Sequence, residues 1–261
     1  MSVRRAAVAG MFYPDNPDRL AAEVRTHVDA ADPPEIDFAL HLLIVPHAGY
    51  IYSGPTAGYA YKLLRRNSFR RIVMVGPAHY VPFTGLALPG VEAMETPLGL
   101  VAIDADAAAA VLQDQIVHNS VEAHRREHSL EVQLPFLQIV APDIPVIPLL
   151  TGAVDPVIAA DAIGPLLDED TLLLVSSDLS HYHGAATARR LDAATAAAIE
   201  RLDADALDSE SACGRTGIQM ALLLAKRHGC RAKTLDLRNS SDTAGPDDRV
   251  VGYGAFAIGN G

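Results

Sequence analysis

The sequence contains no tryptophan, and only 5% of its 261 residues are aromatic. It is also poor in positive charge, because 21 lysines and arginines stand against 32 aspartates and glutamates, for a formal net charge of −11. Proteins that bind nucleic acids usually carry a basic surface, and those that bind single strands add aromatic side chains for base stacking. The sequence therefore predicts no nucleic-acid partner.

Cysteine is almost as scarce, and long apolar runs are missing. The two cysteines, Cys213 and Cys230, cannot form a disulfide framework, and their spacing matches no closed zinc site of the CxxC type. No stretch of about 20 apolar residues is free of charge or proline, and the first residues lead into no apolar run. We therefore expect neither a membrane span nor a signal peptide, and a cytoplasmic location.

Apolar residues are plentiful, since hydrophobic side chains make up 49% of the chain. This content suffices for one substantial core, and we expect a single domain over residues 1–261. Runs rich in valine, leucine and isoleucine predict buried strands at 42–46, 72–76, 146–150, 172–177 and 250–258. Helical patterns lie at 17–28, 55–66, 105–115, 130–140, 156–167, 185–202 and 213–228. The alternation predicts an α/β fold with a mostly parallel or mixed central sheet and helices on both faces.

Two of the predicted strands run directly into a histidine. His47 follows one strand in the string PHAGY, and His79 follows the next in GPAHY. Both histidines should lie at the carboxyl edge of the sheet, where ligand crevices of open α/β sheets are found. One such histidine is compatible with a plain turn residue that hydrogen-bonds to the backbone. Two favour a joint metal or catalytic role, because neutral imidazole is the commonest metal ligand.

A third strand ends in the string SSDLSHYH, which contains Asp178 and His181. A fully apolar strand should not end in Ser-Ser-Asp unless its tip leaves the core, so we expect both side chains to face the same crevice. The alternative is a helix cap formed by Ser177 or Asp178. His183, in the turn before a helix, is expected at the surface.

The string EHSLEVQ carries a denser group of charges. Glu127 and Glu131 are four residues apart, as are His124 and His128, so that a helix would stack each pair on one face. The zinc-protease string HExxH is absent. A helix beginning near Ser129 would place His128 at the mouth of the crevice and point Glu131 inward. A solvated charged turn is the alternative.

Cys213 opens the last long predicted helix. The amide dipoles at a helix start lower the pKa of a thiol and favour a nucleophile. The alternative is a small core residue, which is the usual place of a free cysteine. The segment 239–248 collects Ser, Asp, Gly and Pro and is expected to be a loop, either a lid or a plain connection.

Eight strings in order, spanning about residues 3–256, resemble the Memo family, also called AmmeMemoRadiSam system protein B. They are VRRAAVAGMFYP, IVPHAGYIYSGPTA, VGPAHYVPF, ETPLG, EHSLEVQLPFLQ, SSDLSHY, ACGRTGI and VVGYGAF. The resemblance implies a fold similar to class III extradiol dioxygenases of the LigB type. Those enzymes hold non-haem Fe(II) with two histidines and a carboxylate.

By motif, the resemblance makes His47 and His79 the expected metal ligands. The third ligand is open, because animal members have a cysteine and the dioxygenases a glutamate in the loop before the final strand, where this chain has Asn-Ser-Ser-Asp-Thr. Asp242 is the candidate. If it points away, the metal would be held by histidines plus Asp178, or would be absent. Fe(II) is the expected ion, with Zn or Cu as alternatives.

The resemblance also implies a catalytic set beside the metal. His128 and His181 match histidines that line the same pocket, with Asp178 beside them, and one of the two histidines is the expected acid/base group. Glu131, as the inward-pointing carboxylate, completes the predicted set.

Three functions are compatible with these residues. The leading one is a metal-dependent oxidoreductase, dioxygenase-like, acting on a small aromatic or related substrate. The second is a catalytically silent adaptor like animal Memo proteins, which resemble phosphotyrosine-peptide binders, although phosphate recognition needs converging arginines. The third is a metal-assisted hydrolase, in which Asp178 or a histidine is the base for a metal-activated water. The family's other name also implies AMMECR-type and radical-SAM partners.

Overall fold

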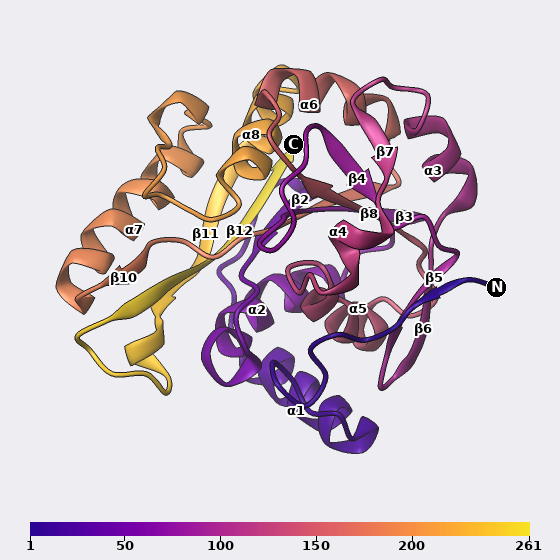
Figure 1. Ribbon diagram of the computed structural model, residues 1–261. Helices are drawn as coiled ribbons and strands as arrows, with labels where there is room; N and C mark the ends of the chain where they lie inside the picture. Colours follow the sequence, from indigo (N-terminus) through magenta and orange to yellow (C-terminus); the bar gives the residue numbers. More distant parts are fainter.

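The computed structural model describes residues 1–261, which form a large mixed sheet, a small second sheet and the helices around them (Figure 1). The middle of the large sheet consists of four parallel strands in the spatial order β2, β9, β3 and β8. Their bounds are β2 (Ala39–Val45), β9 (Thr171–Ser176), β3 (Arg71–Pro77) and β8 (Val146–Thr151). Each coincides with an apolar run in the sequence, because strands buried on both faces need side chains that are apolar throughout.

The edges of the large sheet are antiparallel or short. At one edge β12 pairs antiparallel with β2, and both β10 and β11 pair antiparallel with β12. At the other edge β4 pairs antiparallel with β8, and β7 pairs parallel with β4. The strands of both edges and of the small sheet are β10 (His181–His183), β11 (Arg231–Asn239), β12 (Val250–Asn260), β4 (Leu86–Leu88), β7 (Val117–Asn119), β1 (Val3–Arg4), β5 (Ala93–Thr96) and β6 (Gly99–Ala102). Most of these strands have no apolar run of their own, and therefore only β12 was predicted.

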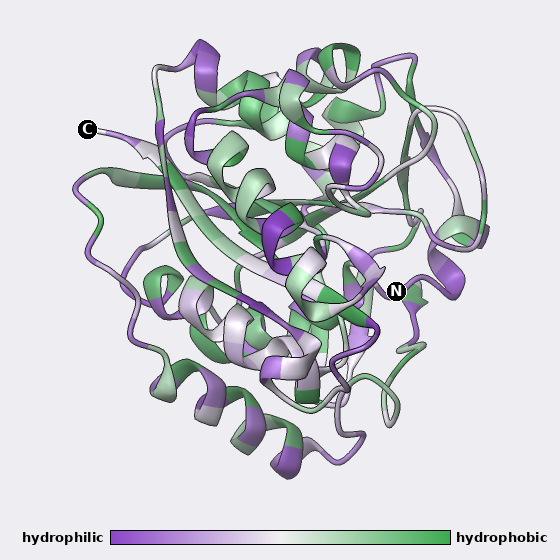
Figure 2. Ribbon diagram, turned by 90° about the vertical axis from the view of Figure 1, so that its left-hand side faces the viewer, coloured by the Kyte–Doolittle hydropathy of each residue, from purple (hydrophilic) through white to green (hydrophobic).

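Helices cover both faces of the sheet, as predicted for the α/β fold. They are α1 (Pro17–Ala30), α2 (Tyr50–Leu64), α3 (Ala105–Val111), α4 (Val121–Arg125), α5 (Leu134–Val140), α6 (Pro156–Ile163), α7 (Ala185–Glu200) and α8 (Arg215–Arg227). Helices α1, α2 and α5 lie below the sheet in Figure 1, and α6 and α8 lie above it. The helix on the outside of the fold at the bottom of Figure 2 alternates between hydrophilic and hydrophobic residues, whereas the central strands are largely hydrophobic.

Two apolar cores of 33 buried residues each fill the layers between sheet and helices. Strand β2 feeds both, since Leu43 and Val45 belong to one core and Leu42 and Ile44 to the other. This alternation follows from the two-residue period of a strand. None of the helices combines the length and the hydrophobicity that a membrane span needs.

The order of the central strands brings three polar residues to one edge. Strands β2, β9 and β3 are neighbours and parallel, and two positions beyond their last residues come His47, Asp178 and His79. The carboxyl edge of an open α/β sheet is where ligands bind in this class of fold.

Candidate metal centre

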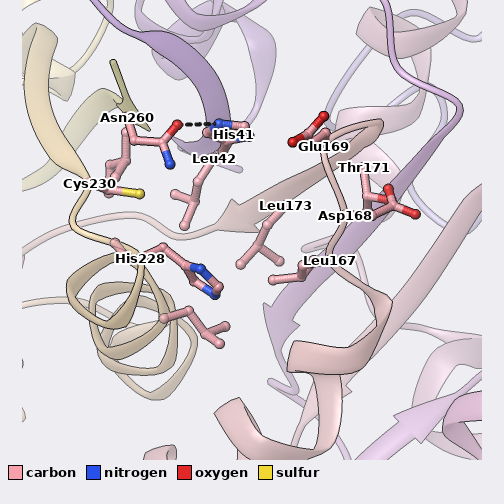
Figure 3. Close-up of a pocket in the computed structure, with 13 residues that line it drawn as sticks. His41, Leu42, Leu167, Asp168, Glu169, Thr171, Leu173, His228, Cys230 and Asn260 are labelled. Atoms are coloured by element: carbon pink, nitrogen blue, oxygen red, sulfur yellow. Dashed lines mark hydrogen bonds between the residues drawn. The ribbon is translucent and has the colours of Figure 1, made fainter.

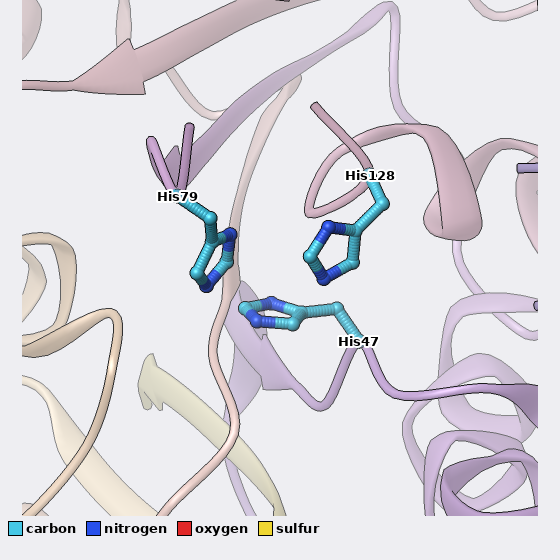
Figure 4. A group of neighbouring side chains, drawn as sticks. All are labelled: His47, His79 and His128. Atoms are coloured by element: carbon cyan, nitrogen blue, oxygen red, sulfur yellow. The ribbon is translucent and has the colours of Figure 1, made fainter. Parts of the chain in front are cut away.

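Three histidines from separate parts of the chain converge at this edge. One ring nitrogen each of His47, His79 and His128 lies within 4.8 Å of the others. The rings of His79 and His128 are stacked with centroids 4.6 Å apart, and His47 meets both edge-on at 5.2 and 5.5 Å (Figure 4). This is the arrangement of side chains that could hold one metal ion.

His47 is fixed by the neighbouring strand β9. Its backbone N–H donates to Asp178 Oδ1 at 2.7 Å, and its Nδ1 lies 3.0 Å from Ser176 Oγ. The Ser176 hydroxyl donates its single hydrogen to the carbonyl of Ser129, so that it accepts at its other contacts, and His47 Nδ1 is therefore the donor. The lone pair of the neutral ring is then on Nε2.

His79 is fixed by Glu127. The carboxylate of Glu127 accepts hydrogen bonds from His79 Nδ1 at 2.9 Å and from the backbone N–H groups of His79, His128 and Ser129. Burial raises the pKa of Glu127, but these hydrogen bonds outweigh it and lower the pKa to about 2. Metal-binding histidines commonly donate their second ring N–H to a carboxylate in this way, which leaves the Nε2 lone pair for the ion.

His128 completes the group. Its ring lies against Phe12, with centroids 4.6 Å apart, and its side chain is 12% exposed. Its Nδ1 is buried without a hydrogen-bond partner, although Glu127 Oε1 is 3.3 Å away. A buried polar atom without a partner is costly, and a bound ligand or ion is one way to satisfy the ring.

The protonation state of two of the rings favours metal binding. Burial, with a contribution from His79, lowers the pKa of His47 to about 3, and burial together with His47 lowers that of His128 to about 4. Both rings are therefore neutral near pH 7, and neutral imidazole is the metal-binding form. The donor set fits a borderline metal ion such as Fe(II), Zn or Cu better than Mg or Ca, which prefer oxygen.

Asp178 and His181 lie beside the three histidines. Burial raises the pKa of Asp178, against the hydrogen bond from His47 N–H and the electrostatic influence of the nearby imidazoles of His181, His128 and His79, which lower it. His181 Nδ1 lies 2.7 Å from the carbonyl of Leu179 and therefore donates to it, so that the neutral ring carries its lone pair on Nε2.

Asp242 and Glu131, the two other predicted carboxylates, have different partners. Asp242 Oδ2 accepts from Asn239 N–H at 2.8 Å and Oδ1 from Arg189 at 2.7 Å; it closes a capping box, and it does not belong to the group of ligand atoms around the histidines. Burial raises its pKa, but those partners outweigh it and hold the pKa below its usual range. The third member of the group is His128, which the sequence suggested as an acid/base residue.

Glu131 is completely buried and holds the N-terminal segment in place. Its carboxylate pairs with Arg4 and accepts hydrogen bonds from the backbone N–H groups of Ala7 and Val8 and from the hydroxyl of Tyr13. These partners occupy the carboxylate, so the structure gives Glu131 a structural role in place of the predicted catalytic one.

Cys213 lies directly against the metal group. Its Sγ is 3.3 Å from His47 Nε2 and 3.6 Å from the carbonyl of Asp178. Burial, with a further contribution from Asp178, raises the pKa of the thiol to about 12, so the alternative of a thiol with a lowered pKa at the start of helix α8 is not found. Burial of the charged form outweighs the helix dipole here.

A cavity of about 290 Å³ lies elsewhere, at the amino ends of β2 and β9 (Figure 3). His41, His228 and Cys230 are among its lining residues, and Leu42, Leu173 and Ile258 supply apolar contacts. The two cysteines of the chain therefore lie at opposite ends of the same strands.

The family model described as Memo-like protein matches residues 4–257. A MEMO1 family protein of Thermoplasma volcanium is 34% identical over 267 residues, with 97% of each chain covered. One of Aquifex aeolicus is 37% identical over 272 residues, covering 97% of this chain and 98% of the relative. One of Saccharolobus solfataricus is 35% identical over 287 residues, covering 98% and 99%.

Among solved structures, an uncharacterized protein of Escherichia coli K12 is similar with a TM-score of 0.50 and 15% sequence identity. The match covers 84% of this chain and 99% of the Escherichia coli chain. At that identity the likeness concerns the fold alone.

Proposed function

The chain belongs to the Memo-like protein family, and we propose that it is a non-haem metal-dependent oxidoreductase acting on a small aromatic or related substrate. The observation that carries the proposal is the group of ring nitrogens from His47, His79 and His128 within 4.8 Å of one another. Fe(II) is the proposed ion. When bound, it would supply Lewis acidity and one-electron redox chemistry.

The protein's own side chains can prepare such a site. Glu127 and Ser176 orient the rings of His79 and His47 so that both Nε2 lone pairs are free. Asp178 is buried and its pKa is raised, and His181, whose Nε2 is free, is close enough to act electrostatically on both Asp178 and His47, so either group can take a proton from a bound hydroxyl.

The surroundings of the histidines support a flat, partly apolar substrate. The ring of Phe12 packs against His128 with centroids 4.6 Å apart, and the ring of Tyr80, which is 50% exposed, has its centroid 6.0 Å from that of His128. Aromatic rings pack well against one another in offset or edge-on arrangements. A small ring could therefore pack against these side chains.

A second function is favoured by the ligand set itself. The group contains three histidines and no carboxylate, which is the set of the zinc hydratase carbonic anhydrase, whereas non-haem iron oxygenases more often use two histidines and a carboxylate. A zinc ion here would favour hydrolysis, with Asp178 or His181 as the base. The metal that the protein holds separates the two proposals.

The test is the metal content of untagged protein, measured by elemental analysis after purification without added metal. We expect close to one iron per chain in the wild type and its loss in His47→Ala, His79→Ala and His128→Ala. His228→Ala, in the distant cavity, is the matched control and should keep the metal.

Oxygen uptake with a panel of catechols, after anaerobic Fe(II) loading, then tests the oxidoreductase. Stoichiometric zinc with ester hydrolysis would favour the second function. A wild-type protein that holds no metal after anaerobic loading would overturn both proposals and favour a binding role.

A further inference from the structure

A second candidate site lies at the edge of the large sheet that is opposite to the histidine group. It is the cavity of about 290 Å³ at the amino ends of β2 and β9, and none of the three histidines of the candidate metal centre lines it (Figure 3). We propose that this cavity binds a small apolar amine in its protonated form. The inference is independent of the metal centre and goes beyond the proposed function.

The floor of the cavity is a row of three apolar side chains on neighbouring strands. Ile258 of β12 is paired in register with Leu42 of β2, and Leu42 is paired with Leu173 of β9. Because neighbouring strands lie about 4.8 Å apart, the three side chains form one continuous apolar surface. Figure 3 shows Leu42 and Leu173 turned toward the same space as the ring of His228. An apolar part of a ligand would lie on this row.

The walls come from the end of helix α8 and from the segment before β9. Leu224 and Ala225 belong to the last turns of α8, and Leu167 precedes β9. The helix ends at Arg227, and Gly229, with a φ of 63°, turns the chain toward β11. The helix therefore stops beside the apolar row and does not continue over it, which leaves the cavity between helix end and sheet.

The size of the cavity limits the ligand. An apolar cavity of about 150 Å³ holds one benzene molecule, and pockets for drug-sized ligands begin at about 300 Å³. The volume of about 290 Å³ therefore suits one ring, or a short alkyl chain, together with one polar group. Since the floor is apolar and the rim is polar, the ligand should carry its polar group at one end.

The charges around the cavity favour a positive group over a negative one. Asp168 and Glu169 are among the 13 residues that line the cavity, and no lysine or arginine is. The carboxylate of Asp168 is occupied by Arg70 and by the hydroxyl of Thr171, whereas that of Glu169 has no ion-pair partner. Helix α8 also ends here, and the carbonyl end of a helix carries partial negative charge. A carboxylate ligand would be repelled by these groups, and an ammonium would be attracted.

The rim also offers unused hydrogen-bond acceptors. His41 Nε2 lies 2.8 Å from Asn260 Oδ1 and donates to it, because an amide oxygen only accepts. The neutral ring of His41 then carries its lone pair on Nδ1, and Asn260 Oδ1 has a second lone pair. Together with the carboxylate of Glu169, these atoms are acceptors of the kind that the three N–H groups of an ammonium need.

Benzylamine is the probe, because it joins one ring to an ammonium group. Calorimetric titration of the wild-type chain should give one site, and phenylacetate, which carries the same ring on a carboxylate, should bind at least tenfold more weakly. Glu169→Gln should weaken benzylamine binding by about two- to fivefold, because an exposed ion pair contributes up to about 1 kcal/mol. Glu122→Gln, an exposed glutamate outside the cavity, is the matched control and should bind like the wild type.

The thiol of Cys230 reports where the probe binds and does not depend on a variant that folds. Cys230 lines the cavity, whereas Cys213 lies against His47 at the other end of the strands, so the chain contains its own reference thiol. Dithiodipyridine reacts with thiols and not with amines, and mass spectrometry of the mixed disulfides gives the rate at each cysteine. Saturating benzylamine should slow the reaction of Cys230 several-fold and leave that of Cys213 unchanged.

Three results would overturn the proposal. They are no binding of benzylamine to the wild type, equal affinities for benzylamine and phenylacetate, and a reaction rate of Cys230 that saturating benzylamine does not change. The metal content of the protein has no part in these measurements, so their failure leaves the proposed metal centre intact, and a protein without metal leaves the amine site intact.

Discussion

The replacement Glu127→Gln should weaken metal binding without emptying the site of its ligands. Glu127 Oε1 accepts three hydrogen bonds, from His79 Nδ1 and from the N–H groups of His128 and Ser129, and Oε2 accepts one from the N–H of His79. Glutamine can keep its oxygen at the Oε1 position. Its amide would then face the N–H of His79, and that hydrogen bond is lost, as is the negative charge.

The magnitude follows from these contacts. A hydrogen bond to a charged group contributes about 1.5–3 kcal/mol, and the loss of a carboxylate that orients a ligating histidine typically costs about 10–100-fold in metal affinity. That range corresponds to about 1.4–2.8 kcal/mol. We therefore expect the dissociation constant for Zn(II) or Co(II) to rise by about 10–100-fold in Glu127→Gln.

Competition titration against a chromophoric chelator measures this constant. Glu122→Gln is the matched control, because Glu122 comes from the same stretch of chain but its side chain is 62% exposed and pairs only with Arg125. Equal affinities for wild type and Glu127→Gln, with an unchanged circular dichroism spectrum, would refute the idea that Glu127 orients the ligands.

Two further predictions concern stability. Glu131→Gln leaves the buried Arg4 without its carboxylate and should lower the free energy of unfolding by about 3–5 kcal/mol in urea titrations, whereas Glu95→Gln, from an exposed pair, should cost less than about 1 kcal/mol. Burial lowers the pKa of His124 to about 4, despite the hydrogen bond to Ala87 O, so the folded state prefers the neutral ring. The contribution of the neutral ring to the free energy of unfolding is therefore complete above pH 6.5 and falls by about 3 kcal/mol between pH 6.5 and 4. The free energy of unfolding of His124→Gln should therefore depend less steeply on pH in this range than that of the wild type. Parallel curves for the two proteins would contradict this.

The sequence was informative where a candidate site residue directly follows a buried strand. His47 and His79 could be found because each follows an uninterrupted apolar run, and such a run defines both the strand and its carboxyl end. The α/β fold was predictable for the same reason. The antiparallel strand β11 was not, because only some of its residues are apolar and its partner β12 stabilises it.

Contacts between segments far apart in the chain could not be predicted from the sequence. The resemblance made His128 an expected acid/base residue, and in the structure its ring nitrogen lies in the group of candidate ligand atoms with those of His47 and His79. The neighbourhood of Cys213 and His47 joins residues 166 positions apart, and no local pattern reports it. Asp242 was chosen from its place in a loop, where a capping box and Arg189 now account for its carboxylate.

The strand order explains why these groups meet at all. Strand β9 is inserted between β2 and β3, so the segment after β9 lies between the two strands that end in His47 and His79. Ser176 at the end of β9 and Asp178 just after it then hydrogen-bond to His47, and the turn at Gly214 lies against Ser177. A change at the tip of β9 should therefore disturb His47 and Cys213 together while Glu127 still holds His79.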